Sequence, residues 1–198
     1  GLRDVEGMRT ETTMRILDRV NGIVDRLARS APDRTELQRT RKVMLDEIGT
    51  TLRTQGATAE ALARYREGLR IGEELAARDP DSADRRRDLS VSHINIGNVL
   101  QDQGQLAEAL AEFRKDLAIA EALAAKDPAN TFLQRDLAVS YEKVGDALRE
   151  DGDKTGALGS FRKSIGIRET LLARNKSDRL AQRDLSVSHE KIGNILAD

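Results

Sequence analysis

Apolar residues along this chain recur at steps of three and four, which is the period of an amphipathic α-helix. Breaks in the pattern occur at Gly104-Gln105 and at Asp127-Pro128, where proline cannot continue a helix. No run of alternating β-branched residues indicates a strand. The pattern therefore predicts an all-α fold of about eight antiparallel helices, at residues 9–30, 34–54, 58–78, 82–102, 106–126, 130–150, 154–174 and 178–197.

One segment recurs along the chain at a fixed interval. Residues 88–93 read DLSVSH and recur unchanged at 184–189, with DLAVSY at 136–141, so the steps are 136 − 88 = 48 and 184 − 136 = 48. Such a period indicates stacked helix pairs. We therefore expect one solenoid over residues 1–198, with repeat units at about 33–80, 81–128 and 129–176 and half-units at 1–32 and 177–198.

Glycine recurs inside the first helix of each pair, at Gly49, Gly97, Gly145 and Gly193. A glycine there costs about 1 kcal/mol relative to alanine, so its recurrence needs a compensation. We expect this compensation to be close helix packing, with small residues on the facing helix at Ala61, Ala109 and Ala157. Stacked pairs of this kind form a superhelix with a concave surface.

The second full pair reads His93-x2-Ile96-Gly97-x2-Leu100, followed by Ala109-x3-Phe113 and then Pro128. This order resembles the tetratricopeptide repeat (TPR) family, whose usual period is 34 residues. The 48-residue period is longer by 14 and is similar to that of kinesin-light-chain-like repeats and of bacterial arrays attached to signalling or defence domains. The resemblance implies a right-handed superhelix in which the first helix of each pair lines a concave groove.

The residues expected to line this groove share one face of the first helices, at steps of three and four. Four valines, at 43, 91, 139 and 187, lie on the same stripe. Asn98 and Asn194 look like the groove asparagine of peptide-binding members, whereas Ile94 and Glu190 replace the lysine of the chaperone-tail clamp. The full predicted set is Arg39, Asp46, Thr50, Arg53, Arg87, Ile94, Asn98, Gln101, Asp102, Arg135, Glu142, Asp146, Arg149, Glu150, Arg183, Glu190 and Asn194.

Arginine recurs at one level of the predicted groove, at residues 39, 87, 135 and 183. Two interpretations stay open. The arginines of one repeat could bridge to aspartates of the next, such as Asp88, Asp136 and Asp184, and brace the stack with ion pairs. Alternatively, they offer forked donors to carboxylates or phosphates of a bound segment.

Composition narrows the range of functions. The 198 residues carry 33 Lys+Arg against 34 Asp+Glu, so the net charge of −1 argues against nucleic-acid or membrane partners. There is no cysteine, and no apolar run has the length of a membrane span, so we expect a cytoplasmic protein. His93 and His189 occupy equivalent positions and are expected to pack, while Gly152–Gly156 lacks the order of a phosphate loop. We therefore expect no enzyme activity, no cofactor and no metal.

These observations favour a protein–protein interaction scaffold that binds a peptide, a helix or a neighbouring domain. The alternative is a structural spacer or self-association element of a larger signalling or defence protein. Residue 1 is Gly rather than Met, which indicates a segment of a longer protein. Because each end is a half-unit, we also expect end-to-end association through apolar residues at positions 14, 17, 20, 23, 24 and 27 and at 185, 192, 195 and 196.

Overall fold

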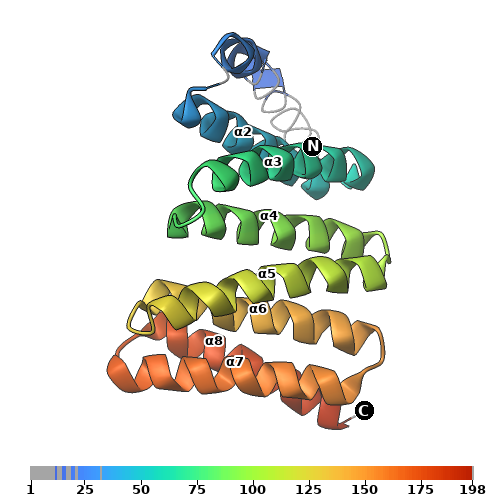
Figure 1. The fold of residues 1–198 in the computed structure, drawn as a ribbon. Helices are drawn as coiled ribbons and strands as arrows, with labels where there is room; N and C mark the ends of the chain where they lie inside the picture. Colours follow the sequence, from blue (N-terminus) through green and yellow to red (C-terminus); the bar gives the residue numbers. More distant parts are fainter. Residues whose placement is uncertain (1–11, 13–14, 17–18, 21, 32, 198) are drawn as a thin grey trace. The chain divides into compact units, whose positions relative to one another are not determined.

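The structure, a computed structural model, describes residues 12, 15–16, 19–20, 22–31 and 33–197, and these residues form helices and turns with no strand. An N-terminal helix runs through 22–30, and the remainder of the predicted helix 9–30 lies partly outside the described residues. The other helices are α2 Thr35–Thr54, α3 Thr58–Arg78, α4 Ala83–Asp102, α5 Leu106–Lys126, α6 Thr131–Glu150, α7 Lys154–Arg174 and α8 Arg179–Ala197 (Figure 1). The predicted all-α fold is confirmed.

Helix starts recur with the interval of the sequence repeat. The first helices of the pairs begin at residues 35, 83, 131 and 179, and the second helices begin at 58, 106 and 154, so every step is 48 residues. The turns between paired helices are set by Gly56, Gly104 and Gly152, whose φ angles of 80°, 73° and 90° favour glycine. The predicted turn between the two helices of a pair is therefore confirmed at these glycines.

The chain divides into two compact units, residues 1–103 and 104–198. In the first unit, α3 packs against both α2 and α4. In the second unit, α6 packs against α5 and α7, and α7 also packs against α8. Each unit thus has the antiparallel stacking that the repeat predicts, while a single solenoid over 1–198 stays a prediction.

Two of the recurring glycines, Gly49 and Gly145, lie against aromatic rings of the following helix, whereas a Cβ built at Gly193 meets no atom within 4 Å. A Cβ added at Gly49 would lie 2.8 Å from Cε1 of Tyr65, and one added at Gly145 would lie 2.8 Å from Cε1 of Phe161. Both rings are almost fully buried. Close packing is therefore confirmed at these two positions, but the neighbour that requires glycine is the ring rather than the alanine four residues earlier.

Candidate interaction surface

The predicted groove residues lie on α2, α4, α6 and α8. We use the name groove face for these residues together with the four valines that lie between them. These valines are exposed, as are Phe132 of α6 and Leu180 and Leu196 of α8. The exposed fractions are 51% at Val43, 41% at Val91, 38% at Val139 and 41% at Val187. Each unit therefore presents two of these valines, one on each of two first helices.

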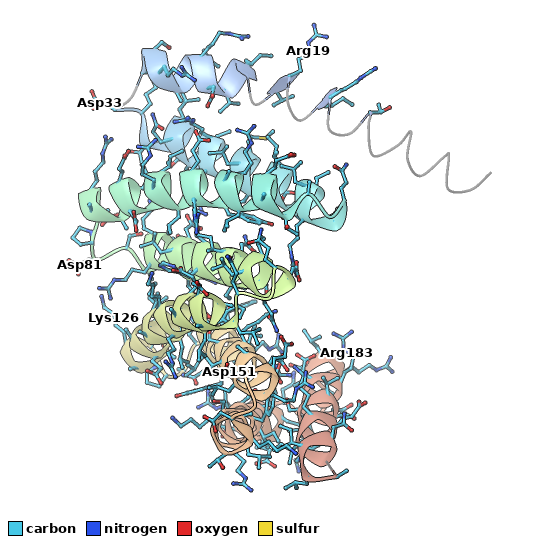
Figure 2. The ribbon with its side chains drawn as sticks, turned by 90° about the vertical axis from the view of Figure 1, so that its right-hand side faces the viewer. Arg19, Asp33, Asp81, Lys126, Asp151 and Arg183 are labelled. Atoms are coloured by element: carbon cyan, nitrogen blue, oxygen red, sulfur yellow. The ribbon has the colours of Figure 1, made fainter. Side chains whose placement is uncertain are left out.

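The arginine column is largely engaged in ion pairs. Arg39 Nε lies 3.4 Å from Asp88 Oδ2, which is the bridge to the next repeat that the bracing interpretation predicts. Arg135 instead pairs with Asp178. Arg183 extends from α8, and its side chain is 75% exposed (Figure 2). Its Nη2 lies 3.6 Å from Oδ1 of the neighbouring Asp184.

Another pair of predicted groove residues joins α2 to α4. Arg53 Nε donates to Asp102 Oδ2 over 2.5 Å, and Arg53 Nη2 donates to Oδ1 of the same carboxylate over 3.1 Å. Hydrogen bonding to the Asp102 carboxylate is the main reason that the pKa of Arg53 is raised. Thr50, also predicted in the groove, donates to the Asp46 carbonyl over 2.9 Å and lies 2.9 Å from the Tyr65 hydroxyl.

The first unit contains a charged pair of two α2 residues that faces α3, and we call it the lysine cluster. Lys42 is only 3% exposed, and its Nζ donates to Asp46 Oδ2 over 2.7 Å. Two glycines of α3 make room for the pair. A Cβ at Gly68 would lie 2.9 Å from Asp46 Oδ1, and one at Gly72 would lie 3.2 Å from Lys42 Cε. Burial raises the pKa of Asp46, and Lys42 offsets part of that effect.

The second unit contains a related group, which we call the arginine cluster. Arg168 of α7 is 5% exposed, and its Nη2 lies 2.9 Å from Glu142 Oε2. Its Nη1 lies 3.4 Å from Asp184 Oδ2, and its Nε donates to Ser164 Oγ over 3.2 Å. Ser188 of α8 donates a further hydrogen bond to Glu142. One guanidinium therefore joins carboxylates of two successive first helices.

The predicted carboxylates of the groove face are thus mostly committed to cations. Asp146 accepts a 2.6 Å hydrogen bond from Lys191, whose Nζ also lies 5.5 Å from the centre of the Phe161 ring. The other predicted residues are either exposed or half-buried. The exposed ones are Arg87, Arg149, Glu150, Glu190 and Asn194, and the half-buried ones are Ile94, Asn98 and Gln101.

Sequence reasoning missed the cations that hold these carboxylates, namely Lys42, Arg168 and Lys191. Arg168 carries a signal in retrospect, because the equivalent positions hold Gly72 and Ala120, so a charged residue interrupts a column of small ones. The histidine prediction is half right. His93 is 8% exposed, as packing requires, but His189 is exposed on α8, the last helix described.

Among the described residues, no group of three or more His, Cys, Asp or Glu side chains is placed to hold a metal ion. No helix in the described part of the chain has the length and apolar character needed to span a membrane. The candidate site is a surface of exposed valines and mixed charge.

This architecture of stacked antiparallel helix pairs defines an all-α helical-repeat protein. A family model described as tetratricopeptide repeat matches residues 43–81 and 94–128, so these two segments are similar to that repeat. Comparison with curated protein sequences gave no significant match.

Three solved structures share the fold. The apo form of RapI superposes with a TM-score of 0.60 at 15% identity, over 91% of this chain and 45% of the RapI chain. BtubC (BKLC) from P. vanneervenii gives a TM-score of 0.53 at 17% identity, over 94% of this chain and 73% of its own. The yeast histone chaperone Hif1 gives 0.58 at 13% identity, over 96% of this chain and 97% of its own. This chain therefore spans less than half of RapI, and all three likenesses support a TPR-like fold.

Proposed function

We propose that this chain is a non-enzymatic protein-interaction scaffold whose groove face holds a peptide, a helix or a neighbouring domain of a protein partner. The observation that carries the proposal is the valine column, exposed by 38% to 51% at one repeat position of four helices. Scattered exposed apolar residues are ordinary, but a column that recurs with the repeat points to a partner surface.

The charges beside the column suit a protein ligand better than a polyanion. Arginines and carboxylates alternate along the groove face, and the whole chain has a net charge of −1. Ion pairs already engage Arg39 and Arg135, so a ligand gains its affinity mainly from the valines and from the exposed Arg149. The description of Hif1 as a scaffold that recruits protein complexes is consistent with an adaptor role. A cytoplasmic location, expected from the absence of cysteine, belongs to the same proposal.

The test is a selection of random 12-residue peptides displayed on phage against the whole chain, followed by titration of the selected peptides. We expect Val139→Lys with Val187→Lys to weaken their binding by about tenfold or more, because a buried ammonium would replace an apolar contact. The matched control is Leu196→Lys, since Leu196 is 66% exposed on α8 but lies nine residues from Val187, on the opposite side of that helix. Selected peptides that bind the double variant as tightly as the parent chain would contradict the proposal.

A second candidate function is self-association through the N-terminal helix. Ile16, Val20, Ile23 and Leu27 are exposed by 59%, 40%, 45% and 50%, and their spacing of three and four places them on one stripe. In α8, Leu196 is 66% exposed, which leaves an apolar side chain at the other end of the chain. We propose that the stripe of one copy packs on α8 of another.

The other apolar residues predicted at the two ends are less available. Val24 and Ile195 are buried, and Leu185 and Ile192 are half-buried, while Met14 and Leu17 lie outside the described residues. Light scattering across a concentration series tests the association: we expect the apparent mass to rise with concentration and Ile23→Lys with Leu27→Lys to abolish the rise. A constant monomer mass at every concentration would exclude it.

A further inference from the structure

A pocket of about 570 Å³ opens within the second unit, between α6, α7 and the turn at Pro128. Its apolar walls are Leu137, Ile167 and Leu171. Gly166 lies at the surface of α7, and a Cβ built there would meet no atom within 4 Å, so the glycine leaves the space open. The pocket therefore combines an apolar floor with an unobstructed mouth.

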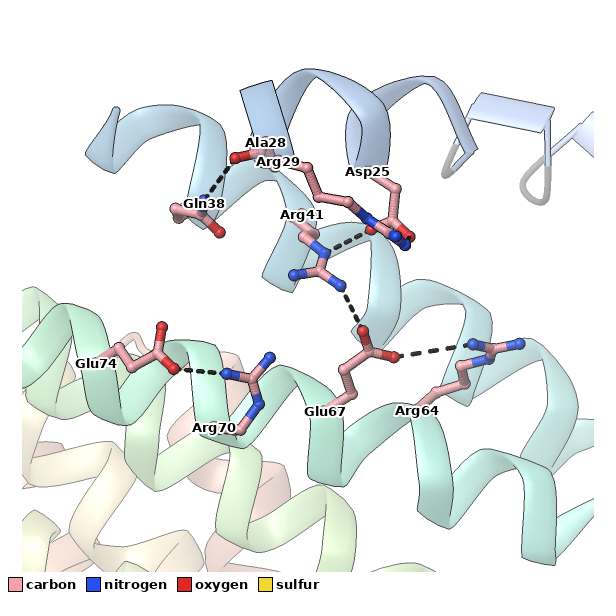
Figure 3. A network of polar contacts seen from close by, with 9 residues as sticks. All are labelled: Asp25, Ala28, Arg29, Gln38, Arg41, Arg64, Glu67, Arg70 and Glu74. Carbon is pink, nitrogen blue, oxygen red and sulfur yellow. Dashed lines mark hydrogen bonds and ion pairs between the residues drawn. The ribbon is translucent and has the colours of Figure 1, made fainter. Parts of the chain in front are cut away.

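The equivalent surface of the first unit, 96 residues earlier, carries charged side chains joined by ion pairs (Figure 3). Arg41 occupies the position of Leu137. Its Nε lies 2.5 Å from Asp25 Oδ1, and its Nη2 lies 2.5 Å from Glu67 Oε1. Arg70 and Glu74, which occupy the positions of Gly166 and Thr170, form a 2.6 Å ion pair across the same surface. The pocket thus lies in the unit that has Leu137 and Gly166 where the other unit has Arg41 and Arg70.

Two cations flank the open pocket. Lys163 replaces Glu67, and its Nζ lies 5.0 Å from the centre of the Tyr141 ring. Arg174 lies at the other end of the pocket, and no ion pair with a described residue engages either cation. The carboxylate of Glu121 is held by the Tyr141 hydroxyl over 2.5 Å. Burial, followed by the bond to Glu121, raises the pKa of Tyr141 to about 12, so the phenol stays a donor.

The pocket is separate from the groove face. On α6 it uses residues 134, 137 and 141, whereas the groove face uses 135, 139, 142 and 146. At about 100° per residue, the two sets point in directions roughly 140° apart around the helix. A ligand in the pocket therefore leaves the valine column available.

We propose that this pocket binds a segment of a protein partner in which a bulky apolar side chain lies between two acidic residues, in the pattern Glu-x-Leu-x-Glu. The apolar side chain contacts Leu137, Ile167 and Leu171, and the two carboxylates approach Lys163 and Arg174. The charge of the mouth selects the acidic flanks, and the apolar floor selects the central residue.

The dimensions agree with an extended segment. Lys163 and Arg174 are 174 − 163 = 11 residues apart on α7, which is about 16 Å along the helix. In an extended peptide, side chains at the first, third and fifth positions share one face, and the outer two are about 13 Å apart. The flexible lysine and arginine side chains span the remaining difference.

The test uses the whole chain and a fluorescein-labelled peptide, Ser-Glu-Ala-Leu-Ala-Glu-Ser, followed by fluorescence anisotropy. We expect it to bind about tenfold more tightly than Ser-Lys-Ala-Leu-Ala-Lys-Ser and than Ser-Glu-Ala-Ser-Ala-Glu-Ser, because each of these lacks one half of the recognition. Lys163→Ala should weaken binding by about fivefold.

The decisive variant is Gly166→Arg with Thr170→Glu, which places the first unit's ion pair over the pocket. This variant should bind the peptide about tenfold or more weakly. The melting temperature of the chain should not fall, since arginine favours a helix more than glycine does. Gly159→Arg is the matched control, because a Cβ at Gly159 also meets nothing within 4 Å but the residue does not line the pocket.

Val139→Lys with Val187→Lys should leave this peptide's affinity unchanged, which separates the pocket from the groove-face proposal. Equal binding of all three peptides, or full binding by the Gly166→Arg/Thr170→Glu variant, would overturn the pocket proposal. So would binding of decanoate, measured by calorimetry, together with no binding of the peptide, which would indicate a small amphipathic acid as the occupant.

Discussion

The lysine cluster of the first unit and the arginine cluster of the second occupy equivalent positions but are built differently. In both, the carboxylate comes from the first helix, at Asp46 or Glu142. The cation comes from that same helix as Lys42 in the first unit and from the second helix as Arg168 in the second unit. Where α7 carries Arg168, α3 carries Gly72, 96 residues earlier.

The arginine column also pairs differently in the two units. Asp88 and Asp184 are equivalent residues of α4 and α8. Lys42 pairs with Asp46, and Asp88 pairs with Arg39. Arg168 has a fork that reaches both Glu142 and Asp184, and Arg135 then pairs with Asp178. Two differences thus accompany the change of partners: the buried cation itself, and Asp178, whose equivalent in the first unit is Ser82.

The largest expected effect comes from removing the cation of the arginine cluster. Arg168→Met should lower the free energy of unfolding by about 3–5 kcal/mol, because Glu142 and Asp184 would stay poorly solvated without their partner. Urea denaturation measures the loss. Arg162→Met, an exposed position on the same helix, should change stability by less than about 0.5 kcal/mol. Equal effects at the two positions would mean that the cluster contributes no specific stability.

A transplant tests whether the two designs are interchangeable. Lys42→Ala leaves Asp46 without its cation, and Gly72→Arg adds a second cation beside Lys42, so each single change should destabilise the chain. The double variant restores one cation facing Asp46 and Asp88, as in the second unit. We expect a favourable coupling of about 1–3 kcal/mol in a double-mutant cycle followed by urea denaturation. Additive losses would show that the lysine cluster cannot accept the cation from α3.

The glycine–ring contact should behave alike in both units, which makes it an internal reference for the comparison. Gly49→Ala and Gly145→Ala should each cost about 1–3 kcal/mol, because the new Cβ would overlap Tyr65 or Phe161. Gly193→Ala meets no atom within 4 Å and should instead stabilise α8 by up to about 1 kcal/mol. Thermal melts of the three variants check the prediction, and a stabilised Gly145→Ala variant would refute it.

The smallest effect concerns pH. Burial raises the pKa of Asp46 above its ordinary value of 3.8, so the folded chain keeps this proton to a higher pH than the unfolded chain does. Stability from the protonated form is therefore lost as the pH rises from about 3.8 through the raised value, and Asp46→Asn should remove this component. Urea midpoints from pH 3 to 6 test it, with the wild type losing stability relative to the variant. A carboxyl resonance of Asp46 that titrates at or below 3.8 would contradict the expectation.

Most of the fold followed from local sequence. The starts of α2, α4, α6 and α8 differ by one residue from the prediction, and the ends of α2 to α8 agree with it. The reason is physical: helical periodicity, glycine turns and prolines act over a few residues and repeat every 48. The ion pairs of the groove arginines were only one of the two alternatives that the sequence left open.

Only the tertiary structure decided which charged side chains meet. The partners Arg39 and Asp88 are 49 residues apart, and Lys191 and Asp146 are 45 apart, so helix propensity carries no information about them. The buried Lys42 and Arg168 look like ordinary surface residues until the facing helix is placed. Gly166 likewise opens a pocket only because Leu137 and Ile167 lie beside it. The sequence by itself determined the repeat and its helices, whereas packing between helices determined which polar groups lost their water and therefore needed partners.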